Sequence, residues 1–504
     1  MENKFTMTTL LSADRLKSPT HSWLRSVHFS RWDGHSTPVL EEAAANLITH
    51  LRRGGHCFQS EPDVDTDVLL TTAPFGEPID WREALLFTAR LRTKLSRTPM
   101  IYTLIHATTA EFQDLLDHFE RVLAKEPPEP SDFAFPGLAP NAYRTLVEQG
   151  RRGGAIMAVE RLLQAQSKCI RIILIVGDER PDQAFYFDLV GAHPSVGADD
   201  LDFFYEDMAL RIVTSARTAE VIQHPVIGDP VQRQEWDGLT TPAAMRAAGI
   251  QLGHREFFTQ MVRIADLVNV PAMADAVAVQ YSEGCFATWD PQLGALIATV
   301  TGSARPVEKD SITSDDLAVI VGVRPDGLGA LVRHVDQKRN DPPSSEAVEM
   351  MDMDSMLPQL DASFVSGTSK PVPVVRSKLH GHRGVDAYNP KRVEFVPLDA
   401  PYYHYPVSCA TEAQARAIKS AFARSKALQN PADPRQVVFT ILPGHGVVIA
   451  EKWVDGKAPF QTIWEYMDSG DLHIDNRVPQ GPMEYAHEAD GTRRLVREVP
   501  QFIE

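Results

Sequence analysis

Short apolar and β-branched runs alternate with amphipathic segments through residues 1–235, and this alternation is the strongest constraint on the fold. The predicted strands are Val68–Thr72, Ile101–Ala107, Ile170–Val176 and Leu210–Thr214, and the predicted helices are Glu83–Leu95 and Glu111–Ala124. Strands that alternate with helices typically form βαβ units. The sequence therefore predicts an N-terminal α/β domain with at least partly parallel strand pairing.

A stretch rich in proline and glycine, His224–Pro242, follows this region. The chain has 504 residues, whereas a typical domain has about 150, so more than one domain is expected. We place the main boundary in this stretch. The prediction is an N-terminal domain over residues 1–235, to which no function is assigned, and a second domain over residues 236–504.

The second half also carries periodic apolar segments. Phe257, Met261, Ile264 and Val268 are spaced as one face of a helix, and a further helix is expected from Thr411, with Gln414 in a capping box. Met350–Lys370 lacks a clear period and is interpreted as an inserted loop. The predicted strands are Leu296–Thr301, Leu317–Val323, Val372–Val375, Val437–Leu442 and Val447–Ala450.

The charge balance and the cysteines limit the partners and the compartment. Lysine and arginine number 50 against 67 aspartate and glutamate, a net charge of −17. This negative excess repels phosphate backbones and anionic lipid, which argues against nucleic acid or a membrane as the main partner. The expected partner is therefore a small-molecule substrate. The four cysteines have no CxxC spacing, and no apolar run is long enough for a signal peptide or a membrane span. We expect a cytoplasmic protein with reduced thiols.

Three places in the second half set chemically active residues beside predicted strands. The strand at Val372–Val375 runs on into LHGHRG, so His380 and His382 point the same way in extended backbone and could reach one metal ion. His445 lies in a PGHG turn between two apolar strands, and Glu346 follows two serines where a helix would start. Each also has a plain structural interpretation, as a hydrogen-bonded pair, a turn residue or a helix cap.

Five blocks, in this order, resemble the class II aldolase/adducin family: YSEGCFATWDP, LIATVTGSARPVEKDSITSDDLAVI, PPSSEAVEM, LHGH and ILPGHGVVI. The resemblance covers about residues 254–465. It implies that the second domain is an α/β/α layered domain with a mostly antiparallel central sheet. It also implies an assembly of several copies, commonly a tetramer.

The resemblance assigns roles residue by residue. His380, His382 and His445 match the family's metal ligands, Glu346 matches its acid/base, and Tyr405 matches a proton-donating tyrosine. The positions that correspond to substrate or phosphate contacts are Ser303, Ser344 and Ser345.

Two departures from the family pattern affect substrate binding. Cys285 replaces the asparagine that normally follows glycine, and a thiol is a poor substitute for an amide. Ala304 replaces the glycine after Ser303, where Arg305 offers a cationic fork in compensation. The 34 residues from Glu346 to His380 exceed the family's spacing, which we attribute to the insertion at Met350–Lys370.

The chemistry implied is that of a metal-dependent lyase. Three imidazoles suit a divalent ion, most simply Zn²⁺, which as a Lewis acid stabilises the enediolate formed when a bond next to a carbonyl breaks. The expected substrate is a small sugar-like carbonyl compound, with or without a phosphate. Epimerisation, decarboxylation or dehydration on the same scaffold, and an adducin-like interaction protein without catalysis, remain the alternatives.

Overall fold

The chain divides into two compact units, each described here by itself. Among the described residues, those up to Thr218 belong to the first unit and those from His224 to the second. The computed structural model describes residues 26–75 (without 33 and 64), 100–124, 170–187, 192–197, 201–218, 224–258 (without 256), 284–301, 309–399 (without 326, 328, 362, 364 and 366–369), 412–442, 446–475 and 483–498.

The division falls earlier in the chain than the expected boundary at residue 235. Val226 and Val231 form isolated bridges with Val332 and Val335 of the second unit. The segment from His224 to residue 235 therefore belongs with the second unit, because its backbone pairs there.

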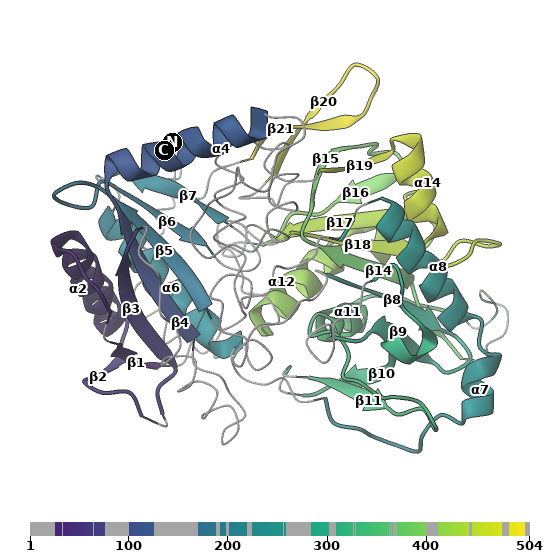
Figure 1. Ribbon diagram of the computed structural model, residues 1–504. Coiled ribbons are helices and arrows are strands. Elements are labelled where there is room, and N and C mark those ends of the chain that lie inside the picture. Colours follow the sequence, from purple (N-terminus) through teal and green to yellow (C-terminus); the bar gives the residue numbers. More distant parts are fainter. Residues whose placement is uncertain are drawn as a thin grey trace. The chain divides into compact units, whose positions relative to one another are not determined.

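The described part of the first unit is built on a seven-stranded sheet in the order β2-β1-β3-β4-β5-β6-β7 (Figure 1). Pairing is parallel from β2 through β5 and antiparallel at β6 and β7. The strands are β1 (His28–Arg31), β2 (Cys57–Gln59), β3 (Val68–Pro74), β4 (Met100–Ala107), β5 (Ile170–Val176), β6 (Gln183–Phe187) and β7 (Ala192–Gly197). The predicted α/β character and partly parallel pairing are confirmed.

Three described helices accompany this sheet: α2 (Pro38–Arg53), α4 (Thr109–Ala124) and α6 (Leu201–Thr218). Thr37 caps α2 by accepting a hydrogen bond from the Leu40 amide, and Pro38 follows at the first helical position. His50 of α2 contacts Asp202 of α6 at 3.0 Å, and Figure 1 shows the two helices side by side. The predicted helix at Glu111–Ala124 is confirmed as α4, and Glu83–Leu95 lies outside the described residues.

The predicted strand at Leu210–Thr214 is wrong, because these residues lie within α6. Buried residues recur along this helix at helical spacing, so the β-rich run is one part of a longer amphipathic pattern. The buried residues are Phe204, Tyr205, Met208, Ala209, Ile212 and Val213.

The main sheet of the second unit has eight described strands in the order β11-β10-β9-β8-β14-β18-β17-β16. Every neighbouring pair is antiparallel except β16 and β17, which are parallel. The strands are β8 (Cys285–Asp290), β9 (Ala295–Thr299), β10 (Leu317–Val323), β11 (Ala330–Arg333), β14 (Val375–Gly381), β16 (Val393–Phe395), β17 (Val437–Leu442) and β18 (Gly446–Lys452). The predictions for β9, β10, β17 and β18 are confirmed, and Val372–Val375 divides between β13 and the start of β14.

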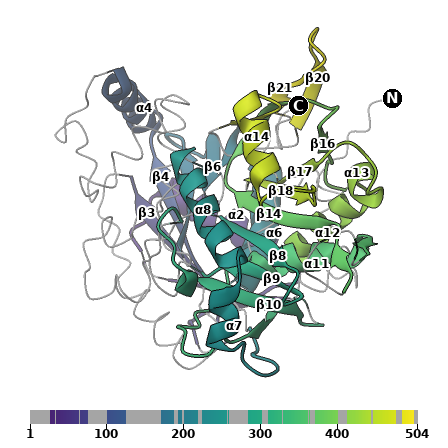
Figure 2. The same ribbon diagram turned by 90° about the vertical axis from the view of Figure 1, so that its right-hand side faces the viewer.

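Helices cover both faces of this sheet (Figures 1 and 2). On one face α7 (Arg233–Gly238), α8 (Thr241–His254) and α14 (Gln461–Ser469) join one large apolar core that includes Trp236, Leu379 and Phe439. The other face packs against α11 (Ala347–Asp352), the 3-10 helix η6 (Met353–Met356), α12 (Glu412–Ala423) and α13 (Lys426–Gln429). Mixed α/β structure is thus established for both units.

Smaller elements complete the second unit. The 3-10 helix η5 (Ser314–Asp316) precedes β10, and β12 (Gln359–Leu360) pairs with β13 (Val372–Pro373). A four-stranded sheet, in the order β19-β15-β21-β20, contains β15 (Gly384–Tyr388), β19 (Leu472–Asp475), β20 (Met483–His487) and β21 (Arg493–Glu498). Among the described helices of the chain, none is both long and apolar enough to cross a lipid bilayer.

Three predictions for this unit need correction or fall outside the structure. The start of the expected loop at Met350–Lys370 is helical, because Met350 and Met353 are buried against the sheet and its flanking helix. Phe257 follows α8 and is not helical, while Met261, Ile264 and Val268 lie outside the described residues. The α12 helix begins at Glu412, Thr411 lies outside the described residues, and the Gln414 side chain bonds to another helix.

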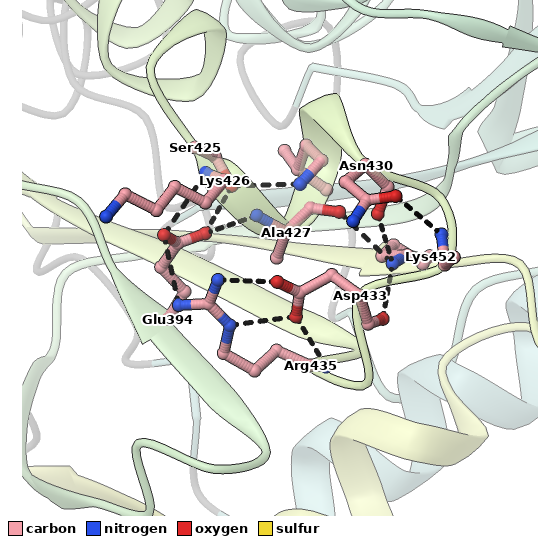
Figure 3. Close-up of polar contacts among 10 residues, drawn as sticks. Glu394, Ser425, Lys426, Ala427, Asn430, Asp433, Arg435 and Lys452 are labelled. Carbon is pink, nitrogen blue, oxygen red and sulfur yellow. Dashed lines mark hydrogen bonds and ion pairs between the residues drawn. The ribbon is translucent and has the colours of Figure 1, made fainter.

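The parallel pair β16–β17 is joined by a crossover that contains α12 and α13, and polar side chains fasten it (Figure 3). Glu394 of β16 accepts hydrogen bonds from the Ser425 hydroxyl and the Ala427 amide at the start of α13. Arg435 pairs with both Glu394 and Asp433. The ammonium group of Lys452 donates to the carbonyl oxygens of Ala427 at 3.1 Å, Asn430 at 3.3 Å and Asp433 at 2.9 Å. Each charged side chain of this cluster is paired with a neighbouring polar group, so the cluster holds the crossover in place.

Candidate functional site

The H-x-H pair lies at the end of β14, on the sheet face that packs against α11. Leu379 belongs to the apolar core on the opposite face, so its neighbours Lys378 and His380 point toward α11. His380 is 1% and His382 8% exposed. Their ring centroids are 5.5 Å apart with an angle of 65° between the ring planes. The structure therefore brings the two predicted ligands together in a buried position.

One hydrogen bond fixes the tautomer of His380. Its Nδ1 lies 3.0 Å from the carbonyl oxygen of Val447 on the neighbouring strand β18. A carbonyl oxygen only accepts, so Nδ1 carries the proton and Nε2 carries the lone pair. Metal-binding histidines are commonly held in this way by a backbone carbonyl.

Glycines allow the backbones of three strands to approach at the H-x-H pair. A Cβ on Gly381, the middle residue of the motif, would lie 2.3 Å from the Phe257 ring. Gly284 precedes Cys285 with φ +73°, and a Cβ there would lie 2.2 Å from the His380 carbonyl oxygen. A Cβ on Gly446 would lie 2.1 Å from the Gly381 oxygen and 2.8 Å from the His382 Cα. Larger residues at these positions would separate the strands that carry the site.

The third predicted ligand, His445, lies outside the described residues, but its neighbour in the chain, Gly446, is described. Gly446 begins β18 and is in close contact with the backbone of Gly381 and His382. Across the part of the chain that the structure describes, no group of three or more histidine, cysteine or acidic side chains is arranged to hold a metal ion.

Cys285 begins β8 and is paired with His380 across the sheet. Its side chain is fully buried, and its thiol donates to the sulfur of Met350 on α11 at 3.6 Å. Burial raises the pKa of this thiol well above its ordinary value, and the acidic side chains of Glu346 and Glu349 act in the same direction. The thiol is therefore held in its neutral form, beside His380 on the neighbouring strand.

Glu346 stands immediately before α11, as the two serines and the proline pair indicated. Its side chain is 8% exposed and accepts a short hydrogen bond from the Ser344 hydroxyl. The Ser344 amide in turn donates to the Thr299 carbonyl at 2.9 Å, which ties the segment to the end of β9. Glu346 is thus a buried carboxyl group that the Ser344 hydroxyl orients. Its charge acts on Cys285, the residue paired with His380.

Two further buried polar groups lie on this face and were not among the predicted site residues. Glu349, one turn after Glu346, is 3% exposed and accepts a hydrogen bond from Gln414 of α12 at 3.0 Å. Lys378, two residues before His380, is fully buried and forms an ion pair with Asp354 of η6. The spacing E-x-x-E and the alternation K-x-H-x-H are the sequence signals that would have found Glu349 and Lys378.

The remaining predicted site residues are distributed as follows. Ser345 is half-buried in the turn before α11. The Ser344 hydroxyl, expected to bind substrate, is engaged with Glu346. Ser303, Arg305 and Tyr405 lie outside the described residues.

Comparison with known proteins adds no assignment: no family model, no curated protein and no solved structure matches this chain.

Proposed function

We propose that the chain is a metal-dependent lyase of the class II aldolase type, which cleaves a carbon–carbon bond in a small sugar-like carbonyl compound. The observation that supports it most is the pair of buried imidazoles on one side of β14, on the sheet face where α11 brings Glu346. Buried polar groups normally serve a structural or chemical purpose, and a cluster of ionisable groups on one face favours the second.

The residues fit a divalent cation with nitrogen ligands. The hydrogen bond from Nδ1 of His380 to the Val447 carbonyl places the lone pair on Nε2, which would be the metal ligand. His382 supplies the second imidazole. We propose His445 as the third, because Gly446, the residue that follows it, is in contact with His382. Three neutral imidazoles with an open position are typical of catalytic zinc. When bound, the ion would stabilise negative charge on the oxygens of the substrate as a Lewis acid.

The protein's own groups would move the protons. Glu346 is the acid/base in this proposal, and the Ser344 hydroxyl orients its carboxyl group. Burial of both side chains limits water and strengthens the hydrogen bond between them. Tyr405 is proposed as the donor to the departing fragment, and Cys285 keeps its proton and packs beside His380.

Metal content tests the site directly. The untagged protein is loaded with Zn²⁺, dialysed and analysed for bound metal, beside a His380→Ala/His382→Ala variant and a His254→Ala control. His254 is exposed at the end of α8 and serves as a matched histidine substitution. We expect wild type and the control to retain one equivalent and the double variant to lose at least tenfold in affinity. Equal metal in all three would refute the metal site.

Glu346→Gln tests the chemistry. The variant should keep the fold and the metal but lose about 10²- to 10⁴-fold in turnover, since it cannot take a proton. The assay is carbonyl release from small sugar phosphates, sugar acids and their non-phosphorylated forms. Bound metal without release from any of these compounds would instead favour an adducin-like protein without catalysis.

A further inference from the structure

A second buried carboxyl group accompanies Glu346 on α11. Glu349 lies three residues later, so the two side chains project from the same side of the helical turn. Both are nearly inaccessible, at 8% and 3% exposure. The charge of Glu346 acts on Glu349 directly, and both carboxyl groups act on the Cys285 thiol. They therefore share one poorly solvated environment between α11 and β8.

We propose that Glu346 and Glu349 hold a single proton between them and that it resides on Glu349, which is thereby a positioning residue that keeps Glu346 ionised. The inference rests on the proposed function in one respect, since Glu346 is the acid/base there. The pairing itself follows from the arrangement of the groups.

Within the part of the chain that the structure describes, no positive charge compensates Glu349. Gln414 of α12 donates a neutral amide hydrogen bond to its Oε2 at 3.0 Å, and Cys285 of β8 is a neutral thiol. Lys378 of β14 is neutralised by Asp354 of η6. Lys309 donates to the Val300 carbonyl at 3.4 Å, and its charge acts on Cys285. Among the described residues, no cation forms an ion pair with Glu349.

The hydrogen bonds decide which carboxyl group is ionised. Glu346 accepts the short bond from Ser344, and a donor of this kind stabilises a carboxylate. No described residue gives a hydrogen bond to Oε1 of Glu349, so its ionised form would be poorly compensated. Burial raises the pKa of Glu349 well above its ordinary value, and the charge of Glu346 raises it further. Two carboxyl groups so placed titrate as a pair.

The first test uses the pH dependence of unfolding. Folded Glu349 keeps a proton that the unfolded chain releases above about pH 4.3, so this residue makes the fold less stable as pH rises toward its folded pKa. Glu349→Gln removes this decline. Urea unfolding of both proteins is measured from pH 5 to 8. The folded-to-unfolded ratio of the variant, divided by that of wild type, should rise by up to about tenfold per pH unit. Glu235→Gln, at an exposed glutamate of α7, should run parallel to wild type.

The second test measures the sharing of the proton. Glu349→Gln is repeated in a Glu346→Gln background, where the neighbouring charge is absent. Because the pKa of Glu349 is then lower, the stability gap between the two proteins should stop widening at a lower pH and reach a smaller final size. An unchanged gap, or parallel curves for Glu349→Gln and wild type, would overturn the proposal. Should Glu349→Gln not fold, Glu349→Met, which fills similar space without ionising, replaces it in both comparisons.

These measurements involve neither metal nor substrate. A failure of the metal test above would remove the lyase proposal alone, whereas parallel unfolding curves would remove the shared proton alone.

Discussion

The two faces of the eight-stranded sheet are made by alternate residues of the same strands, yet they are stabilised differently. On β14, Leu379 enters the large apolar core under α8 and α14, whereas Lys378 and His380 enter the layer under α11. The first face depends on apolar area, which is tolerant of exchange. The second face also buries apolar side chains, but around β14 it adds charged and polar partners whose loss leaves a buried group uncompensated. The face that carries the buried ion pair and the histidine pair is therefore the harder one to alter.

The largest effect is expected from breaking the ion pair on the polar face. Lys378→Met leaves Asp354 buried without its cation, which should lower the free energy of unfolding by about 3–5 kcal/mol. Replacing both residues, in Lys378→Met/Asp354→Leu, should restore most of it. Urea unfolding followed by circular dichroism measures both. A loss of under about 1 kcal/mol in the single variant would contradict this account.

The matching change on the apolar face is Leu379→Ala, expected to cost about 2–5 kcal/mol through lost burial and the cavity left behind. Unlike the Lys378 variant, it should have the same cost at pH 5.5 and pH 8, since it exposes no new charge. Ile250→Ala, at an exposed position of α8, should change stability by less than about 0.5 kcal/mol.

A methyl group at the centre of the H-x-H motif should have an intermediate effect. Gly381→Ala places a Cβ against the Phe257 ring and should cost about 1–3 kcal/mol by overpacking. The zinc affinity of this variant, measured by competition with a chromogenic chelator, should fall together with its stability. Phe257→Leu in the same chain should recover stability; no recovery would show that the crowding lies elsewhere.

The smallest effect is expected at the sheet edge, which belongs to neither face. Burial lowers the pKa of His224 to about 4, and the ring accepts a hydrogen bond from the Ala330 amide. Below pH 6.5 the unfolded chain binds a proton that the folded chain binds only near pH 4, so stability falls as pH falls through this window. His224→Gln should remove about 1–2 kcal/mol of this loss at pH 5. Identical acid profiles would contradict it.

The pattern of apolar residues predicted the central strands because each of these buried strands is a short, nearly continuous run of apolar residues. Ile170–Val176, Leu317–Val323 and Val437–Leu442 are strands with those bounds. Leu210–Thr214 was misread because five β-rich residues were judged apart from the 18-residue helix that contains them. Met350 and Met353 were missed as helical because their burial depends on distant strands and on α12.

For the site, local spacing predicted His380, His382 and the position of Glu346 at a helix start, since each signal lies within a few residues. The burial of Glu346 did not follow from this spacing, because the sheet and α11 together enclose the side chain. Glu349 and Gln414 are 65 residues apart and Lys378 and Asp354 are 24 apart. Contacts at such separations arise from tertiary packing, which spacing along the chain does not encode.

The crossover held by Glu394 also carries α12, the helix whose Gln414 contacts Glu349. Its outer strand, β16, is three residues long and lies at the margin of the sheet, and α12 with Gln414 is attached through it. Fraying of β16 would loosen the attachment of α12 and with it the hydrogen bond from Gln414 to Glu349. Slow amide exchange at Val393–Phe395 would thus show how firmly this helical layer is held on the sheet.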